Sequence, residues 1–123
     1  MRQTFRKSQR LCSRSLIERL FAHSGSKSAT AYPIRAVFRN ADTPQTQILL
    51  SVPKRLFKHA VDRNRVKRQL REAYRTQYLD LLPADKTLHI AFIWLSDKHQ
   101  SSQVIAAKMR NLLNRIAETC EKS

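Results

Sequence analysis

Residues 61–75, VDRNRVKRQLREAYR, decide how this chain folds and what its surface offers to a partner. At the 3.6-residue period of an α-helix, Val66, Leu70, Ala73 and Gln77 fall on one face, and most of the charged side chains fall on the opposite side. The stretch contains six cations and two acids. It therefore predicts an amphipathic helix that docks through its apolar face and leaves a basic side outward.

The chemistry of this basic side favours phosphate as its ligand. Arginine outnumbers lysine five to one along the stretch, and a guanidinium group forks onto phosphate oxygens whereas an ammonium group acts as a point charge. A helix that is merely solvated usually interleaves acids at i, i+4 spacing, and here only Glu72 is available for such pairs. Arg63, Asn64 and Arg65 fall in the first turn, where free N–H groups and the helix dipole attract anions.

The composition of the whole chain agrees with a polyanionic partner. The 123 residues suit one domain spanning 1–123, in which the basic segment 1–10 is expected to be a flexible tail. The formal net charge is +15, which favours nucleic acid because each neutralised phosphate releases counterions. An anionic membrane surface is the rival interpretation, but the basic segments lack the Trp/Phe/Leu-rich face of an interfacial helix.

Several classes of protein are excluded by what the sequence lacks. No apolar run is long enough for a transmembrane helix. Gly25 is the only glycine, so neither a Walker loop nor a dinucleotide-binding fingerprint can be built. Cys12 and Cys120 match no metal-binding spacing, and we expect free thiols in a reducing cytoplasm.

Hydrophobic periodicity and turn residues predict an α+β fold with helices packed on a small mixed sheet. The strand 45–52 is expected to form a hairpin with the strand before it, because NADTP between them is typical of a turn. Asp62 is expected to be the N-cap of the basic helix. The expected elements are a helix over 13–23, a loop over 23–30, strands over 32–40 and 45–52, the basic helix to about residue 79, a buried central strand over 88–95, and a last helix from residue 101 or 102.

A second basic cluster, Lys54, Arg55 and Lys58, directly precedes the basic helix. A helix-turn-helix reader of double-stranded DNA would need a partner helix just upstream, joined by a tight turn. A strand and a connection that begins at Pro53 stand there instead, which disfavours that class.

Residues 51–75, SVPKRLFKHAVDRNRVKRQLREAYR, strongly resemble the protein subunit of bacterial ribonuclease P. That family carries an Arg-Asn-Arg motif, here Arg63, Asn64 and Arg65, after a strand end of the type Ser-Val-x-Lys-Lys/Arg, here residues 51–55. The similarity extends more weakly to RLCSRSLIERLF ahead of this stretch and to LHIAFIWL behind it, so it covers nearly the whole chain.

The resemblance implies a two-layer α/β sandwich in which a left-handed β-α-β crossover carries the Arg-Asn-Arg helix. It also implies a cytoplasmic ribonucleoprotein endonuclease that removes the 5′ leader of precursor tRNA, with catalysis in the RNA and no membrane or obligate protein partner. No cofactor or metal is expected on the protein itself, and Mg²⁺ is expected to be required by the catalytic RNA. The residues expected to contact that RNA are Arg63, Asn64, Arg65, Lys67, Arg68, Arg71 and Arg75, together with Lys54, Arg55 and Lys58.

The resemblance further implies a cleft between the first helix and the sheet that takes the single-stranded leader. Ile17 and Phe21 would line it from the helix, although many relatives have an aromatic residue where Ile17 stands. A base can stack on Phe21, which could equally be an ordinary core residue. One face of the strand 32–40 would form the other wall. We prefer the face with Tyr32, Ile34 and Ala36 over the face with Arg35 and Val37.

No residue pattern indicates that the protein itself is the catalyst. The acids are scattered without the spacing of a two-metal site, and His59 in the basic connection is a weaker candidate for acid–base chemistry than for an RNA contact. A structural ribosome-associated protein or an RNA chaperone with the same basic surface is the second hypothesis. A protein-only nuclease is the third.

Overall fold

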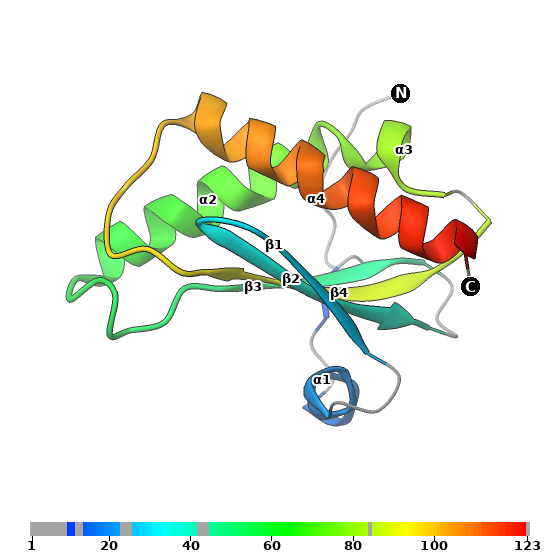
Figure 1. Ribbon diagram of the computed structural model, residues 1–123. Helices are drawn as coiled ribbons and strands as arrows, with labels where there is room; N and C mark the ends of the chain where they lie inside the picture. The colour runs from blue at the N-terminus through cyan, green and yellow to red at the C-terminus, as the bar shows by residue number, and fades with distance from the viewer. Residues whose placement is uncertain (1–9, 12–13, 23–25, 42–44, 84, 123) are drawn as a thin grey trace.

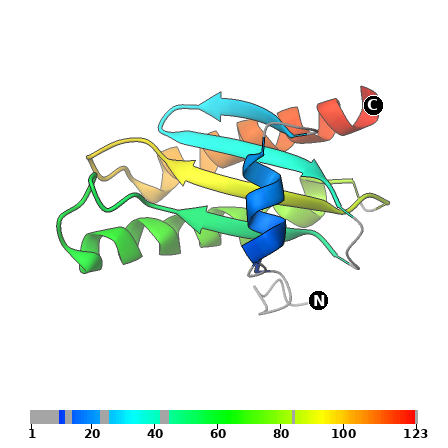
Figure 2. The same ribbon diagram turned by 90° about the horizontal axis from the view of Figure 1, so that it is seen from below.

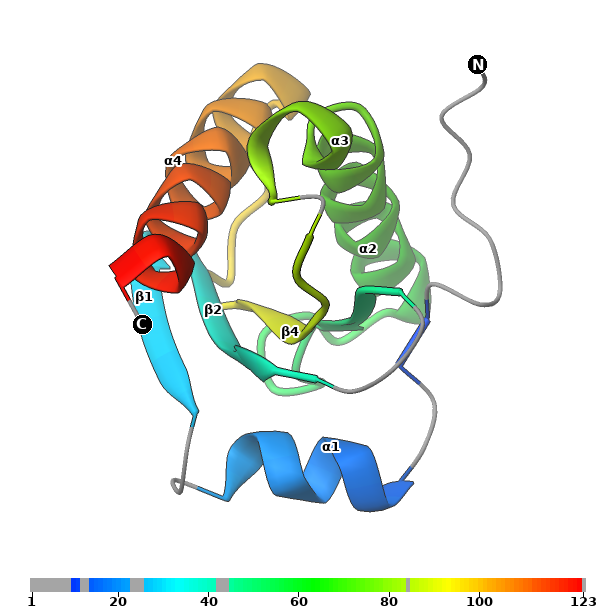
Figure 3. The same cartoon turned by 90° about the vertical axis from the view of Figure 1, so that its right-hand side faces the viewer.

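The computed structural model describes residues 10–11, 14–22, 26–41, 45–83 and 85–122. The elements in chain order are α1 (Arg14–Phe21), β1 (Lys27–Ala31), β2 (Ile34–Asn40), β3 (Gln47–Ser51), α2 (Ala60–Arg75), α3 (Tyr78–Leu81), β4 (Leu88–Trp94) and α4 (Ser102–Lys122). The strands form one mixed sheet, with α1 on one face and α2, α3 and α4 on the other (Figures 1 and 3). The predicted α+β sandwich is confirmed.

The sheet has the order β1-β2-β4-β3, so β4 lies between two strands that precede it in the chain. β2 is antiparallel to both β1 and β4, whereas β3 is parallel to β4, with Leu50 opposite Phe92. Seen from the α1 side in Figure 2, β3 and β4 run in the same direction and the connecting α2 lies behind them. This crossover is left-handed, the rare hand for such connections, and it confirms the expectation drawn from the family resemblance.

Both faces of β4 are buried, as expected for a central strand. Leu88, Ile90, Phe92 and Trp94 are at most 1% exposed and pack toward α2 and α4. Ala91 faces the other way, into a smaller cluster that α1 covers with Leu20 and into which Leu11 and Val37 also pack. Because apolar layers cover both sides, the strand has the continuous apolar sequence that predicted it.

The predicted start and the predicted apolar stripe of the last helix are both confirmed in α4. Ser101 precedes the first turn, and its Oγ accepts a hydrogen bond from the Val104 N–H at 3.2 Å, which satisfies one free donor of the helix start. The stripe residues Ile105, Met109, Leu112, Leu113 and Ile116 are all completely buried. α4 is therefore the main cover of the sheet on this side.

Two predictions about the strands are wrong. Residues 27–30 of the predicted loop, together with Ala31, form β1, whose Ala29 and Ala31 pack against the helix-side core. β2 and β3 form no hairpin, because β4 occupies the position between them. β2 and β3 do run in opposite directions, but a turn signal in the sequence does not decide which strand becomes the neighbour.

The helix bounds also differ from the sequence prediction. α1 is shorter than expected, and α2 begins at Ala60 with His59 as its N-cap, ahead of Asp62. α2 ends at Arg75, and a separate short helix, α3, follows. Gln77 lies between them and donates to the carbonyl of Ala106 on α4 at 3.1 Å, so it belongs to the docking face as predicted.

Candidate nucleic-acid interface

The apolar side of α2 is completely packed, which fixes the direction of its basic side. Val66, Leu70 and Tyr74 are 0% exposed and Ala73 is 5% exposed. On the far side of the helix, Asn64, Arg65 and Arg68 are exposed, and Lys67 and Arg71 are half-buried. We call Arg65, Lys67, Arg68 and Arg71 the basic face of α2.

Acidic side chains neutralise little of this face. In the parts of the chain that the structure describes, Arg65, Lys67 and Arg68 form no ion pair with an acidic side chain. Like charges therefore gather on one exposed surface at a cost in self-repulsion, which a polyanion bound there would relieve.

Arg75 departs from the predicted set, because it is paired with an acid. Its Nε donates to Oε2 of Glu72 at 3.0 Å, and its Nη2 contacts Oε1 of the same carboxylate. The hydrogen bond from Arg75 lowers the pKa of Glu72. Arg75 therefore brings little net positive charge to the basic face, and the RNA contact predicted for it stays a prediction.

Arg63 also differs from its neighbours, since it holds the loop before the helix. Its Nη1 donates to the carbonyl of Phe57 at 2.8 Å and to that of Lys58 at 3.4 Å. The second basic cluster stands on this loop, where Lys54, Arg55 and Lys58 are exposed. The motif arginine thus fixes the place of the loop cations relative to α2.

The loop before α2 is also held by a stacking contact between Phe57 of the loop and His99. The ring of Phe57 is buried and stacks on His99 with centroids 4.8 Å apart. His99 Nε2 lies 3.1 Å from Oδ1 of Asp62 on α2. Asp62 is therefore a link between α2 and the segment before α4 rather than an N-cap, and the spacing in sequence gave no sign of this contact.

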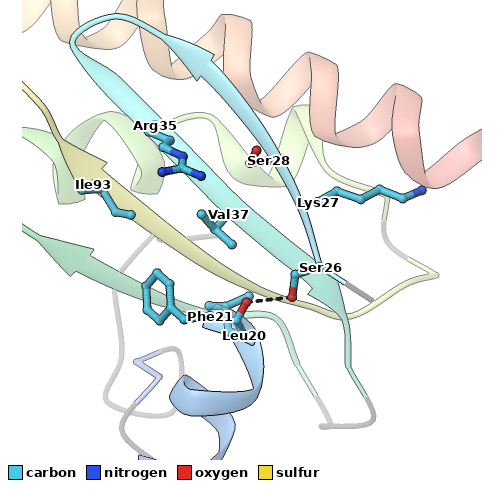
Figure 4. Close-up of a pocket in the computed structure, with 8 residues that line it drawn as sticks. All are labelled: Leu20, Phe21, Ser26, Lys27, Ser28, Arg35, Val37 and Ile93. Atoms are coloured by element: carbon cyan, nitrogen blue, oxygen red, sulfur yellow. Dashed lines mark hydrogen bonds between the residues drawn. The ribbon is translucent and has the colours of Figure 1, made fainter. Parts of the chain in front are cut away.

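A cleft of about 300 Å³ lies between α1 and the sheet (Figure 4). Phe21 contributes an exposed ring from α1, and Arg35, Val37 and Ile93 form the sheet wall. The lining is completed by Leu20, Ser26, Lys27 and Ser28. Ser26 closes the α1 end, because its hydroxyl donates to the carbonyl of Leu20 at 2.7 Å. An exposed aromatic ring and an arginine in one cleft suit an unstacked base with its backbone phosphate.

The preferred face of β2 for this cleft is wrong. Ile34 and Ala36 are completely buried in the core between the sheet and α4, so the opposite face of the strand lines the cleft. Tyr32 is exposed, but it lies in the turn between β1 and β2, outside the cleft lining. Ile17 packs partly buried against the cluster under α1 and does not line the cleft. Of the predicted cleft residues, Phe21 alone lines this pocket, and its contact with the leader stays a prediction.

The N-terminal segment pairs with the edge of the sheet, a contact that the sequence did not predict. Arg10 forms an isolated parallel bridge with Ile48, and the Leu11 N–H donates to the Ile48 carbonyl at 2.8 Å. The chain therefore enters the fold along the outer edge of β3. Of the tail expected over 1–10, only Arg10 is described, and it is bridged to β3, whereas residues 1–9 lie outside the described residues, as does Cys12. Cys120 is a buried cysteine on α4.

Buried His89 lies on the α1 side of the sheet, next to arginine side chains. It is 3% exposed and stands opposite Arg39, whose Nη1 donates to the Arg19 carbonyl at 3.2 Å. Burial lowers the pKa of His89, and the charges of Arg39 and Arg19 lower it further. The folded chain therefore resists the protonation of this ring.

This lowered pKa predicts that the chain loses stability in mild acid. Below about pH 6.5, the ordinary pKa of histidine, His89 becomes protonated in the unfolded chain but stays neutral in the folded one. The free energy of unfolding therefore decreases as the pH is lowered, until the pKa of folded His89 is passed. Urea unfolding at about pH 7.5 and about pH 5 should show a larger loss for the wild type than for His89→Gln. Equal losses in the two proteins would contradict this assignment.

The described residues also bear on two other classes of site. Their side chains include no group of three or more His, Cys, Asp or Glu residues placed to hold a metal ion. Among the same residues, no helix is long and apolar enough to cross a membrane.

The fold and its surface define a small basic α+β protein built around a left-handed crossover. The family model described as Ribonuclease P matches residues 5–117, and the chain belongs to this family. A ribonuclease P protein component from Porphyromonas gingivalis is 36% identical over 118 residues, covering 90% of this chain and 85% of the relative. One from Chlorobaculum tepidum is 29% identical over 127 residues, covering 88% and 82%.

Solved structures share the fold. The ribonuclease P protein of Thermotoga maritima matches with a TM-score of 0.73 at 23% identity, covering 86% of this chain and 96% of that one. The Staphylococcus aureus protein matches with a TM-score of 0.70 at 18% identity, covering 88% and 94%. The predicted family is confirmed, and it supports a role for the chain as a ribonuclease P subunit in tRNA processing.

Proposed function

We propose that the chain binds the catalytic RNA of ribonuclease P through the basic face of α2 and the cations of the preceding loop. The observation that carries this proposal is the one-sided charge of α2. Its apolar side is buried, while Arg65, Lys67 and Arg68 have no acidic partner among the residues that the structure describes. Arg63 serves indirectly, since it holds the loop with Lys54, Arg55 and Lys58 beside the helix.

The cleft under α1 binds the single-stranded 5′ leader of precursor tRNA. Phe21 offers a stacking surface for a base, and Arg35 lines the same cleft and offers a guanidinium group to a backbone phosphate. Val37 and Ile93 supply the apolar floor. The leader and the catalytic RNA thus meet different surfaces of one small protein, whose charge offsets their mutual repulsion.

The catalytic RNA, not the protein, hydrolyses the phosphodiester bond, and RNA ligands hold most of the Mg²⁺. The protein holds no cofactor and contributes charge and shape. His59 is exposed at the start of α2, where it is suited to an RNA contact. The assembled ribonucleoprotein is cytoplasmic and processes the 5′ ends of tRNA.

Reconstitution with a ribonuclease P RNA and a leader-bearing precursor tRNA tests this function. We expect the chain to increase the rate of leader removal most strongly at low magnesium, because its cations replace part of the screening that Mg²⁺ gives. The gain should shrink as magnesium rises. Cleavage that is unaffected by the chain at every magnesium concentration would contradict the proposal.

A further inference from the structure

A second cavity, of about 220 Å³, lies at the outer edge of β3, away from the cleft under α1. Its floor is aliphatic, and its rim carries cations from two segments that are distant in sequence. Arg10 comes from the N-terminal segment, and Lys67 and Arg71 come from α2. The rest of the lining comes from Leu11, Ile48, Leu49 and Leu50, of which Ile48 and Leu50 pack on the α2 side of the sheet and Leu11 and Leu49 on the α1 side. We call this cavity the edge pocket.

The edge pocket also contains backbone groups that can form hydrogen bonds. The Ile48 carbonyl accepts from the Leu11 N–H, so the backbone groups of Ile48 point outward from the sheet. Alternate residues of a strand point their N–H and C=O groups the same way, so those of Leu50 also point outward. Within the described residues, no backbone partner meets Leu50 on this edge, because the bridge ends at Ile48.

We propose that the edge pocket binds a single unstacked nucleotide of an RNA partner. This inference rests on the proposed function, because it adds a site for one base to the RNA-binding surface of α2. The base lies on the aliphatic floor, where the N–H and C=O of Leu50 can pair with its polar edge. Its phosphate meets Lys67 and Arg71, and Arg10 covers the open side with a guanidinium plane, on which bases stack well.

The composition of the rim favours a nucleotide over an added peptide strand. A free strand edge can also bind an extended peptide through main-chain hydrogen bonds. A peptide, however, gives three clustered cations little to neutralise, whereas each nucleotide brings a phosphate and a flat apolar ring together. Inorganic phosphate alone would leave the aliphatic floor without a contact.

Nuclear magnetic resonance on the full chain, labelled at isoleucine and leucine methyl groups, tests the edge pocket with mononucleotides. Adenosine 5′-monophosphate should shift the methyl signals of Ile48 and Leu50 through the ring current of the base. Ribose 5-phosphate and inorganic phosphate should leave these signals in place. The methyl signal of Ile93 reports separately on the cleft under α1.

Two variants define the role of the rim. Lys67→Ala should weaken the adenosine monophosphate response by about tenfold, the effect of losing one charge-assisted hydrogen bond. Lys108→Ala, which removes a cation from α4, is the matched control and should leave the response unchanged.

Several results would overturn the inference. Methyl signals that ignore adenosine monophosphate, or that respond equally to ribose 5-phosphate, would show that no base enters the pocket. A response of Leu50 to an acidic extended peptide and none to the nucleotide would assign the edge to a peptide partner. Any of these results could stand beside a successful reconstitution, so the two proposals can fail separately.

Discussion

Replacing Arg65 and Arg68 together by alanine should lower the affinity of the chain for ribonuclease P RNA by about 10- to 100-fold. Both side chains are exposed on α2, and neither is paired with an acid in the described part of the chain. Each guanidinium that meets a phosphate releases counterions, so the dependence of log affinity on log salt should flatten by about two units. Filter binding or fluorescence titration over a series of salt concentrations measures both quantities.

A control pair on α4 separates the place of the charge from its amount. Lys108→Ala with Arg110→Ala also removes two positive charges, but from α4, which lies outside the proposed surface. This pair should change the salt slope far less than Arg65→Ala with Arg68→Ala. Equal slopes in the two double variants would mean that net charge alone attracts RNA, and the assignment of the basic face of α2 would be withdrawn.

The elements that could be predicted from the sequence are those whose side-chain pattern is set within one segment. Buried positions recur along α2 and α4 at the helical period, and β4 is apolar throughout because both of its faces are covered. β1 has no such pattern. In its sequence, KSATA, only the small side chains of Ala29 and Ala31 pack against the core. The strand therefore lacks the alternation of large apolar and polar residues by which a strand is predicted.

Strand neighbours and strand faces could not be predicted because they depend on distant segments. β2 alternates between a face with Ile34 and Ala36 and a face with Arg35 and Val37, and the sequence shows that these faces differ. The sequence favours the more apolar face for the cleft, but α2 and α4 form the larger layer and bury this face. The basic and less apolar face was left for α1, which is a single short helix and leaves room for the cleft.

The binding surface was predicted as a set of residue types, but the roles within it come from contacts. Arg63 and Arg75 belong to the same basic stretch as Arg65 and Arg68. One holds a loop through backbone carbonyls, and the other pairs with Glu72. Neither contact changes the helical spacing, so only the folded geometry divides the arginines into those that organise the surface and those that are open to a ligand.

Phe21→Ala should weaken binding of leader-bearing precursor tRNA to the reconstituted enzyme and leave mature tRNA binding unchanged. Stacking of a base on an aromatic side chain contributes about 1–3 kcal/mol, so the loss for the precursor should be about 5- to 150-fold. The ring is 41% exposed in the cleft, so its removal opens little of the core and should leave urea unfolding nearly unchanged. Competition between precursor and mature tRNA measures the difference directly.

Tyr32→Ala is the matched control for this prediction, because it also removes an exposed aromatic ring. Tyr32 lies in the β1–β2 turn, outside the cleft lining, so its loss should not alter the preference for the precursor. If Tyr32→Ala had the larger effect, the leader would follow the turn rather than the cleft. If Phe21→Ala weakened precursor and mature tRNA equally, the ring would act by holding α1 on the sheet, and the assignment of the cleft to the leader would be wrong.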